Sequence, residues 1–307
     1  MPTQSSVATR LVLGVIYAVV ATVASMLLAR FLKEDGSGND SFDATIRGCL
    51  VTPQNESLND VGGLATIKDE LRKIVLLPLK YPDAFFKGPK ALHPPRGVLL
   101  HGPPGTGKTM LARALASESG VPFVALTSST LESRWYGDTP KLLASAFRLA
   151  RDEWQPCILF MDEIDGMGRK RSDLDQACVY SFKTELLRNM DSVQDAAVVV
   201  LGCTNCPDSL DPALRRRFAR VVHVGKPDGA ARLDILHTLC REETLVDEDV
   251  LKEVAKRTAG KTGSDLASLF AAASSARLDH GVVEHALRTG KDPVAALGPL
   301  ALDHWRV

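Results

Sequence analysis

The stretch Gly102-Pro103-Pro104-Gly105-Thr106-Gly107-Lys108-Thr109 decides how the rest of this sequence is interpreted. It matches G-x-x-x-x-G-K-S/T, a loop whose backbone N–H groups surround a chain of phosphates. In such a loop the lysine reaches the outer phosphates and the hydroxyl reaches Mg²⁺. Glycines at positions 102, 105 and 107 leave room for the backbone to approach the phosphates. A glycine-proline turn that happens to precede a helix is the alternative interpretation.

The flanking residues supply the context that this motif requires. The apolar run 97–100 is typical of a strand, and residues 110–116 have helix-forming composition. Strand, glycine loop and helix in this order bring the positive end of the helix dipole to the phosphates. We therefore predict a site for a nucleoside triphosphate and Mg²⁺, with Thr109 as a metal ligand. Its phosphate-binding residues are Gly102, Pro103, Pro104, Gly105, Thr106, Gly107, Lys108, Thr109 and Met110.

Length and composition set broad limits. With 307 residues the chain can hold one large domain or two, together with shorter segments. Basic and acidic residues both number 37, so the charge balance gives no reason to expect a nucleic-acid partner. The six cysteines have no disulfide-like spacing, which favours a reducing compartment. Cys203 and Cys206 form a lone C-x-x-C, so two packed cysteines are favoured over a redox or zinc site.

Residues 11–29 form a run of 19 residues without a charge, bounded by Arg10 and Arg30. As a helix this run would be about 28 Å long, close to the hydrocarbon thickness of a bilayer. A cleaved signal peptide is the competing interpretation, but its apolar region is usually shorter and a small-residue cleavage site is missing after Ala29. We predict a single membrane helix. Basic residues are more frequent after the run than before it, which places the rest of the chain in the cytosol.

Composition divides the remainder of the chain into three parts. Residues 33–58 are polar and are expected to form a linker with one short helix near 45–51, following an anchor at residues 1–32. Residues 59–225 alternate amphipathic helical stretches with short runs that are apolar on both faces, as in a parallel sheet covered by helices. These strand-like runs are 97–100, 121–126, 157–161, 198–201 and 221–224. Residues 226–307 are helical only, at 230–240, 247–258 and 264–279, and predict a small helical domain.

Two adjacent carboxylates, Asp162 and Glu163, follow the apolar strand at 157–161. The carboxyl ends of strands in an open α/β sheet are where ligands bind. Asp162 suits a contact with Mg²⁺ through water, and Glu163 suits activation of the attacking water. A charged turn is the alternative for this pair alone, but the upstream glycine loop favours the catalytic interpretation.

Three further features have a functional and a structural interpretation. Asn205 follows the strand at 198–201 and could orient the attacking water, although its local pattern favours a turn residue. Arg216 and Arg217 lie in a basic cluster that is either a solvated helix end or a donor of guanidinium groups to a neighbouring subunit's phosphates. Trp135 and Tyr136 stand beside a glycine among charged residues, and either pack in the core or bind a partner from an exposed loop.

These residues together resemble the AAA group of P-loop ATPases. The matching motifs occur in that family's order over roughly residues 58–278, at 60–63, 102–109, 162–165, 204–205, 216–218 and 263–265. The resemblance implies ATP hydrolysis with Mg²⁺ by a ring, normally of six subunits, with ATP at the subunit boundaries. By the same resemblance Asp60, Gly62 and Gly263 border the nucleotide and Asn205 is the first sensor. Arg216 and Arg217 would act on the neighbour's nucleotide, and their adjacency leaves open which of them reaches it.

Within that group the chain is similar to the mitochondrial sorting ATPase family of the outer mitochondrial and peroxisomal membranes. The single anchor, the short linker, the run at 75–80 and the loop at 134–137 carry this likeness. It implies a homohexamer, facing the cytosol, that extracts mislocalised tail-anchored proteins from the bilayer. Trp135 and Tyr136 would then grip the threaded polypeptide in a central pore.

Two other functions would share part of this sequence pattern. A microtubule-severing relative would share the ring and the pore motif, but it would be expected to carry a basic, tubulin-seeking N-terminal region. A membrane-anchored AAA protease requires His-Glu-x-x-His on a helix to hold zinc. Residues 280–285 contain two histidines and a glutamate in a different order.

Overall fold

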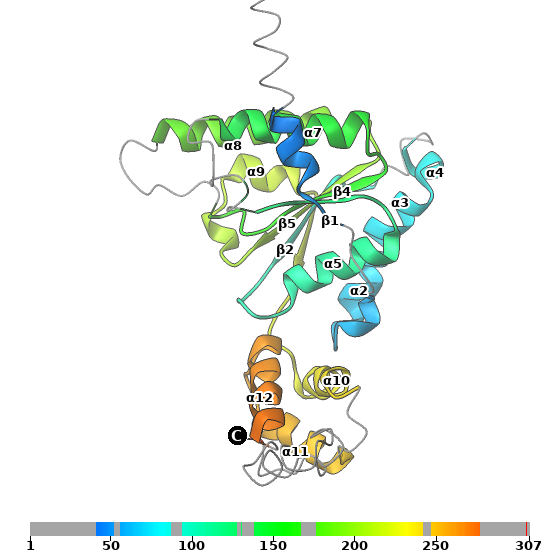
Figure 1. The fold of residues 1–307 in the computed structure, drawn as a ribbon, viewed down its shortest axis with the longest axis vertical. Coiled ribbons are helices and arrows are strands. Elements are labelled where there is room, and N and C mark those ends of the chain that lie inside the picture. Colours follow the sequence, from blue (N-terminus) through cyan, green and yellow to red (C-terminus); the bar gives the residue numbers. More distant parts are fainter. Residues whose placement is uncertain are drawn as a thin grey trace, which may run out of the picture. The chain divides into compact units, whose positions relative to one another are not determined.

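The computed structural model describes residues 41–51, 56–86, 94–127, 130, 138–166, 176–241, 247–276 and 305 (Figure 1). It divides into two compact units at Gly48 and Cys49. In the first unit, residues 41–47 form a helix, several residues earlier than the one expected near 45–51. Among the described residues no helix has both the length and the apolar character needed to cross a bilayer. The expected membrane helix at 11–29 lies outside them.

The second unit contains a six-stranded sheet in the order β1-β3-β4-β5-β2-β6. The strands are β1 (Leu50–Val51), β3 (Phe123–Leu126), β4 (Cys157–Met161), β5 (Val198–Thr204), β2 (Gly97–His101) and β6 (Arg220–His223). All neighbours are parallel except β1, which pairs antiparallel with β3. The predicted α/β class with a parallel sheet is confirmed. The antiparallel strand β1 was missed, because its two residues lie in a stretch that reads as linker.

Burial explains why the central strands could be recognised. Every residue of β4 and β5 is buried, as expected for strands covered on both faces. Leu50 and Val51 of β1, by contrast, are 41% and 40% exposed. Gly202 in β5 is required by its neighbours, since a Cβ there would lie 2.3 Å from Cδ1 of Ile164. The sheet is therefore tightly packed at its centre and open at its β1 edge.

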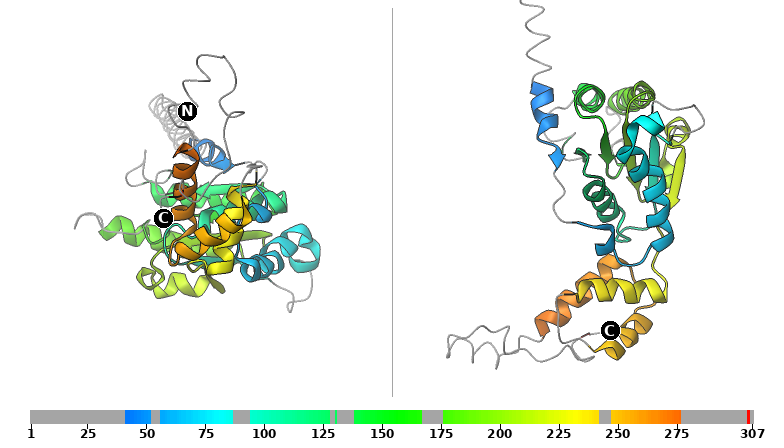
Figure 2. Two further views of the ribbon diagram at one scale, coloured as in Figure 1. Left: turned by 90° about the horizontal axis from the view of Figure 1, so that it is seen from below. Right: turned by 90° about the vertical axis from the view of Figure 1, so that its right-hand side faces the viewer.

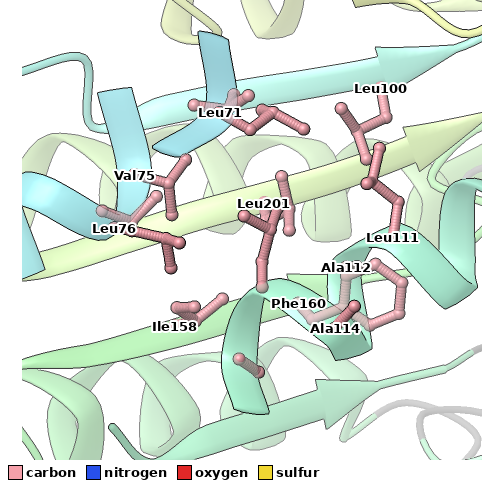
Figure 3. Packing of buried hydrophobic residues seen from close by; sticks show 14 of the residues in the cluster. Leu71, Val75, Leu76, Leu100, Leu111, Ala112, Ala114, Ile158, Phe160 and Leu201 are labelled. Carbon is pink, nitrogen blue, oxygen red and sulfur yellow. The ribbon is translucent and has the colours of Figure 1, made fainter. Parts of the chain in front are cut away.

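Helices cover both faces of this sheet. One face is covered by α5 (Lys108–Ser119) and by a run made of α2 (Ala65–Leu71), the π-helix η2 (Arg72–Leu76) and α3 (Leu77–Lys80). Leu71, Val75 and Leu76 of this run and Leu111 of α5 belong to one core cluster and lie around the strand residue Leu201 (Figure 3). On the other face lie α7 (Thr139–Asp152) and α8 (Gln176–Ser192) (Figure 1). Shorter elements are η1 (Leu58–Asp60), α4 (Pro82–Phe86), η5 (Pro207–Ser209) and α9 (Pro212–Arg217).

A group of three helices follows the sheet in the sequence: α10 (Gly229–Leu239), α11 (Glu248–Arg257) and α12 (Gly263–Ala276) (Figure 2). Their predicted positions agree with the structure to within about one residue at each described start. Asp228 and Asp247 cap α10 and α11 by accepting hydrogen bonds from backbone N–H groups of the first turn. The helices share a core of their own, to which the distant Trp305 also contributes. That these helices form a small domain separate from the sheet stays a prediction, and they are called the helical domain below.

Candidate nucleotide-binding site

The glycine loop between β2 and α5 adopts backbone conformations that its glycines make accessible. Gly102 has φ +150°, and a Cβ there would lie 2.1 Å from the carbonyl oxygen of Val224. Gly105 has φ +75° and approaches the side chain of Thr262 in the helical domain. Any larger residue at these two positions would open the loop or push the helical domain away. The glycines of the loop thus permit the curvature that is needed to surround phosphates.

Lys108 is the first residue of α5, and its side chain is buried inside the curve of the loop. Its Nζ donates hydrogen bonds to the carbonyl oxygens of Gly102 at 2.9 Å and Pro103 at 2.8 Å. Burial lowers the pKa of this ammonium, whereas the nearby carboxylates of Asp162 and Asp165 act in the opposite direction. A phosphate would supply the compensating negative charge at close range.

Thr109 and Asp162 bring two oxygen atoms together across the ends of α5 and β4. The Thr109 hydroxyl donates to Oδ2 of Asp162 at 2.8 Å, and Oδ1 of Asp162 accepts from the Glu163 backbone at 3.0 Å. Oxygen donors fit Mg²⁺, which takes few protein ligands and completes its shell with water and phosphate. The described residues contain no cluster of three or more His, Cys, Asp or Glu side chains able to hold a metal alone.

Glu163 occupies a backbone conformation that is rare for a residue with a side chain. Its φ is +49°, in the left-handed region, and the conformation is held by hydrogen bonds on both sides. The Ile164 N–H donates to the carbonyl of Cys203 at 3.0 Å, and the Gly166 N–H donates to the carbonyl of Glu163 at 2.7 Å. Such strain is concentrated at functional sites. Here it directs an exposed carboxylate to the same pocket as Lys108.

Asn205 lies in this pocket, directly after β5. The turn that follows the strand is fixed by Thr204, whose hydroxyl donates to Asp165 at 2.7 Å and accepts from the Cys206 N–H at 3.0 Å. No hydrogen bond to the Asn205 side chain occurs among the residues that the structure describes. Asn205 lines the pocket, and its role as a sensor stays a prediction.

A cavity of about 460 Å³ joins these groups to the helical domain. It brings together most of the predicted site: Asp60, Gly62, Pro104, Gly105, Thr106, Gly107, Lys108, Thr109, Met110, Asp162, Glu163, Asn205 and Gly263. Gly102 and Pro103 lie behind it and hold Lys108. Sequence reasoning missed Ile235, Thr238, Leu239 and Ala267, which form an apolar wall on α10 and α12 suited to a base. These positions look like ordinary core positions of amphipathic helices, so no sequence signal distinguishes them.

Gly62 and Gly63 allow their segment of the chain to approach helix α10 closely. A Cβ on Gly62 would lie 2.4 Å from the Cα of Ile235, and one on Gly63 would lie 2.8 Å from the Cβ of Ala231. The segment at 60–63 is therefore pressed against α10, with no space for side chains. On the other side, the Ser264 N–H donates to the carbonyl of Gly105 at 3.0 Å. The cavity is thus walled by both the sheet domain and the helical domain.

Asp60 contributes to the site by holding this segment in place. Its Oδ2 accepts a hydrogen bond from the Ser57 N–H at 2.7 Å, and its Oδ1 pairs with the guanidinium of Arg241. Arg241 also donates to the carbonyl of Asn59 at 3.0 Å. The hydrogen bond from Ser57, followed by the contact with Arg241, lowers the pKa of Asp60. The pair therefore links the helical domain to the segment at 60–63 at neutral pH.

Replacing Arg241 by methionine should weaken ATP binding by roughly 3- to 10-fold, the range expected for losing one exposed ion pair and one hydrogen bond. The loss should be smaller at high salt, because the pair is exposed to solvent. Titration with a fluorescent ATP analogue would measure it. Arg257→Met is the matched control, since Arg257 pairs with Glu253 inside the same helix. Equal affinities for both variants would show that Asp60 and Arg241 do not support the site.

The remaining predicted residues lie elsewhere. Arg216 and Arg217 line a separate cavity of about 910 Å³, together with Arg96, Asp191 and residues near the start of β2. They are therefore not part of the nucleotide pocket of their own chain. Trp135 and Tyr136 lie outside the described residues.

The sheet, the glycine loop after β2 and the paired carboxylates after β4 define a P-loop nucleotide-binding protein. Comparisons with known proteins narrow this class. The model of the "ATPase family associated with various cellular activities (AAA)" matches residues 98–226. The crystal structure of the FIGL-1 AAA domain in complex with ADP covers 87% of this chain and 88% of its own, with 32% identity and a TM-score of 0.70. The chain belongs to the AAA family of ATPases.

Curated relatives extend this result. An outer mitochondrial transmembrane helix translocase of Danio rerio is 39% identical over 247 residues, covering 79% of this chain and 64% of the relative. The Homo sapiens protein of the same name is 37% identical and covers 77% and 67%. Protein SAV of Sulfolobus acidocaldarius is 40% identical over 73% of this chain, but only 29% of its own length is matched. The chain thus spans less than two thirds of the length of the Danio rerio and Sulfolobus acidocaldarius relatives. The resemblances to AAA ATPases and to this translocase family are confirmed.

Proposed function

We propose that this chain is a membrane-anchored homohexameric ATPase that extracts mislocalised tail-anchored proteins by threading them through a central pore. The observation that supports the proposal is a pocket that brings Lys108, Thr109, Asp162, Glu163 and Asn205 together, in a chain 39% identical to an outer mitochondrial transmembrane helix translocase. The proposed location is the outer mitochondrial or the peroxisomal membrane. Residues 11–29 would span the bilayer and leave the ATPase domain in the cytosol.

Each residue of the pocket would have its own role in ATP hydrolysis. Lys108 and the N-terminal turn of α5 bind the outer phosphates of ATP. Thr109 and Asp162 would hold Mg²⁺, which would supply positive charge close to the phosphates. Glu163 accepts a proton from the attacking water, and Asn205 orients that water.

The cavity's two-domain construction would connect hydrolysis to movement. In this cavity ATP would contact the sheet domain through its phosphates and the helical domain through its base. A change in the phosphates therefore alters how Ser264 and the segment at 60–63 hold the two domains together. In a ring, such a change would shift one subunit's pore loop relative to the next.

The grip on the substrate can be tested separately from ATP hydrolysis. Replacing Trp135 and Tyr136 together by alanine should leave ATPase activity within about twofold and reduce extraction at least about tenfold, because the aromatic contacts are lost. Extraction would be measured by the release of a labelled tail-anchored protein from vesicles carrying the full chain. Tyr180→Ala, which removes a 74% exposed tyrosine from α8, is the matched control. Unchanged extraction by the double variant would remove the pore proposal.

The membrane end of the proposal has its own test. Deleting residues 1–31 should release the chain from membranes while ATP binding is retained, because the pocket lies wholly in later residues. Fractionation and imaging of a C-terminally tagged chain would show this. A deleted chain that remains on membranes would contradict the anchor. Microtubule severing by the full chain, in place of extraction, would favour the severing alternative.

A further inference from the structure

Lys68 contacts the backbone of the segment at 60–63, which closes one side of the nucleotide cavity. It lies in the middle of α2, and its Nζ donates a hydrogen bond to the carbonyl oxygen of Val61. No other donor to this carbonyl occurs in the described part of the chain. Val61 lines the cavity, whereas Lys68 does not. The ammonium therefore acts on the cavity through the backbone of Val61.

A reversal of the chain brings these two groups together. Gly63 and Leu64 both have positive φ, +67° and +57°, immediately before α2 begins. This left-handed conformation is uncommon for a leucine, and it turns the chain sharply at the start of the helix. The Lys68 N–H donates to the carbonyl of Leu64 at 2.9 Å, so the turn continues directly into α2. As a result, the Lys68 ammonium can reach a carbonyl seven residues earlier in the sequence.

The charged groups around Lys68 come from two different helices. Burial is the main cause that lowers the pKa of Lys68, and Arg72 adds to it, whereas Asp234 of α10 and Asp69 act in the opposite direction. Taking an ammonium partly out of water is unfavourable unless the group is hydrogen-bonded, and the carbonyl of Val61 supplies that bond. The charge of Lys68 is therefore felt both at Val61 and on α10, the helix that supplies much of the apolar wall.

Holding the Val61 carbonyl decides which backbone groups face the cavity. Val61 is extended, with φ −91° and ψ 103°, and its N–H donates to the carbonyl of Leu58 at 3.4 Å. Successive residues of an extended chain direct their backbone groups to opposite sides. Gly62 lines the cavity, and neither its N–H nor its carbonyl is hydrogen-bonded to another described residue. These groups offer a ligand one donor and one acceptor.

We infer that Lys68 is a positioning residue for the base of the nucleotide, because it holds the Val61 carbonyl and so fixes the adjacent backbone against which adenine would bind. The inference rests on the proposed placement of ATP in this cavity. Adenine presents an amino donor beside an acceptor nitrogen, which fits a backbone acceptor beside a backbone donor. Guanine presents an oxygen acceptor beside an N–H donor at the same edge, so it would not fit the same pair. Lys68 would therefore affect binding of the base and leave binding of the phosphates to the glycine loop.

Lys68→Met tests the inference, since methionine keeps most of the apolar length and removes the donor. The affinities for ATP and ADP should fall by a similar factor of about 10-fold, the scale of one lost hydrogen bond from a charged group. Inorganic tripolyphosphate with Mg²⁺, which lacks a base, should bind within about twofold of the wild-type affinity, because the glycine loop is unchanged. The preference for ATP over GTP should also decrease. Calorimetric titration of the full chain measures all four ligands.

Steady-state hydrolysis gives a second measurement. The KM for ATP should rise about 10-fold in Lys68→Met while kcat stays within about twofold, the pattern of a lost binding interaction that does not change on the way to the transition state. Lys68→Arg keeps a charged donor and should retain the ATP affinity within about threefold. Lys73→Met is the matched control, because Lys73 is exposed on η2 in the same helical run, and it should behave like the wild type.

Four outcomes are decisive. Unchanged ATP affinity in Lys68→Met would overturn the inference. Equal losses for ATP and tripolyphosphate would also overturn it, since Lys68 would then support the fold or the glycine loop and not the base. A fall in kcat with an unchanged KM would move Lys68 to the hydrolytic step. A wild-type chain that binds neither ATP nor tripolyphosphate would instead defeat the proposed function.

Discussion

Glu163→Gln is expected to bind ATP like the wild-type protein and to hydrolyse it about 10³-fold more slowly, the scale of a lost general base. Glutamine has nearly the same shape, but its amide cannot accept the proton of the attacking water. The contact between Thr109 and Asp162 does not involve the Glu163 side chain and should persist. Binding without turnover would hold the proposed ring in its ATP-bound state.

Two measurements on the same samples check this expectation. Nucleotide titration gives the affinity, and phosphate release gives the rate. Glu153→Gln is the control, because Glu153 precedes β4 whereas Glu163 follows the same strand at its other end. Wild-type turnover by Glu163→Gln would defeat the assignment of the catalytic base. A loss of binding would show that this carboxylate supports the pocket itself.

Lys108→Met should weaken ATP binding by at least about 100-fold, since a buried charge-assisted contact with phosphate is lost. Methionine fills a similar volume without charge. It also leaves the carbonyls of Gly102 and Pro103 without the donors that now hold the loop. The effect should be smaller for ADP, because the lysine contacts the outer phosphates.

Thermal unfolding offers an independent measurement for this variant. A ligand that binds the folded state raises the melting temperature, so saturating ATP should stabilise the wild-type chain but not Lys108→Met. Lys73→Met, on an exposed position of η2, should respond to ATP like the wild type. An equal ATP-dependent shift in Lys108→Met would mean that the loop binds phosphate without its lysine.

Much of the fold could be predicted because its signals are local. The strands β4 and β5 are buried throughout, so their apolar runs are visible in the sequence. The glycine loop and the carboxylates at 162 and 163 were also recognisable, since each motif follows such a strand. The strand β1 could not be predicted, because two exposed residues are too few to show a hydrophobic periodicity.

Other parts of the site depend on contacts between distant residues. The wall formed by Ile235 and Leu239 becomes a base pocket only when α10 meets the segment at 60–63. Likewise, the sequence alone does not distinguish the adjacent residues Arg216 and Arg217. Asp191, 26 residues away from Arg217, is what separates them. Pairing of this kind is set by the tertiary structure and has no local pattern.

The short strand β1 has a mechanical consequence. It joins the sheet at two residue pairs, Leu50 with Val124 and Val51 with Phe123, and the Ala125 N–H also donates to the carbonyl of Cys49 at 3.0 Å. Traction on the N-terminal segment would peel β1 from β3 one pair at a time, while the five parallel strands stay joined. In the proposed membrane-anchored protein, β1 would therefore detach from the sheet before the central strands separate. The segment between the membrane helix and the sheet would become longer, and the nucleotide pocket would stay intact.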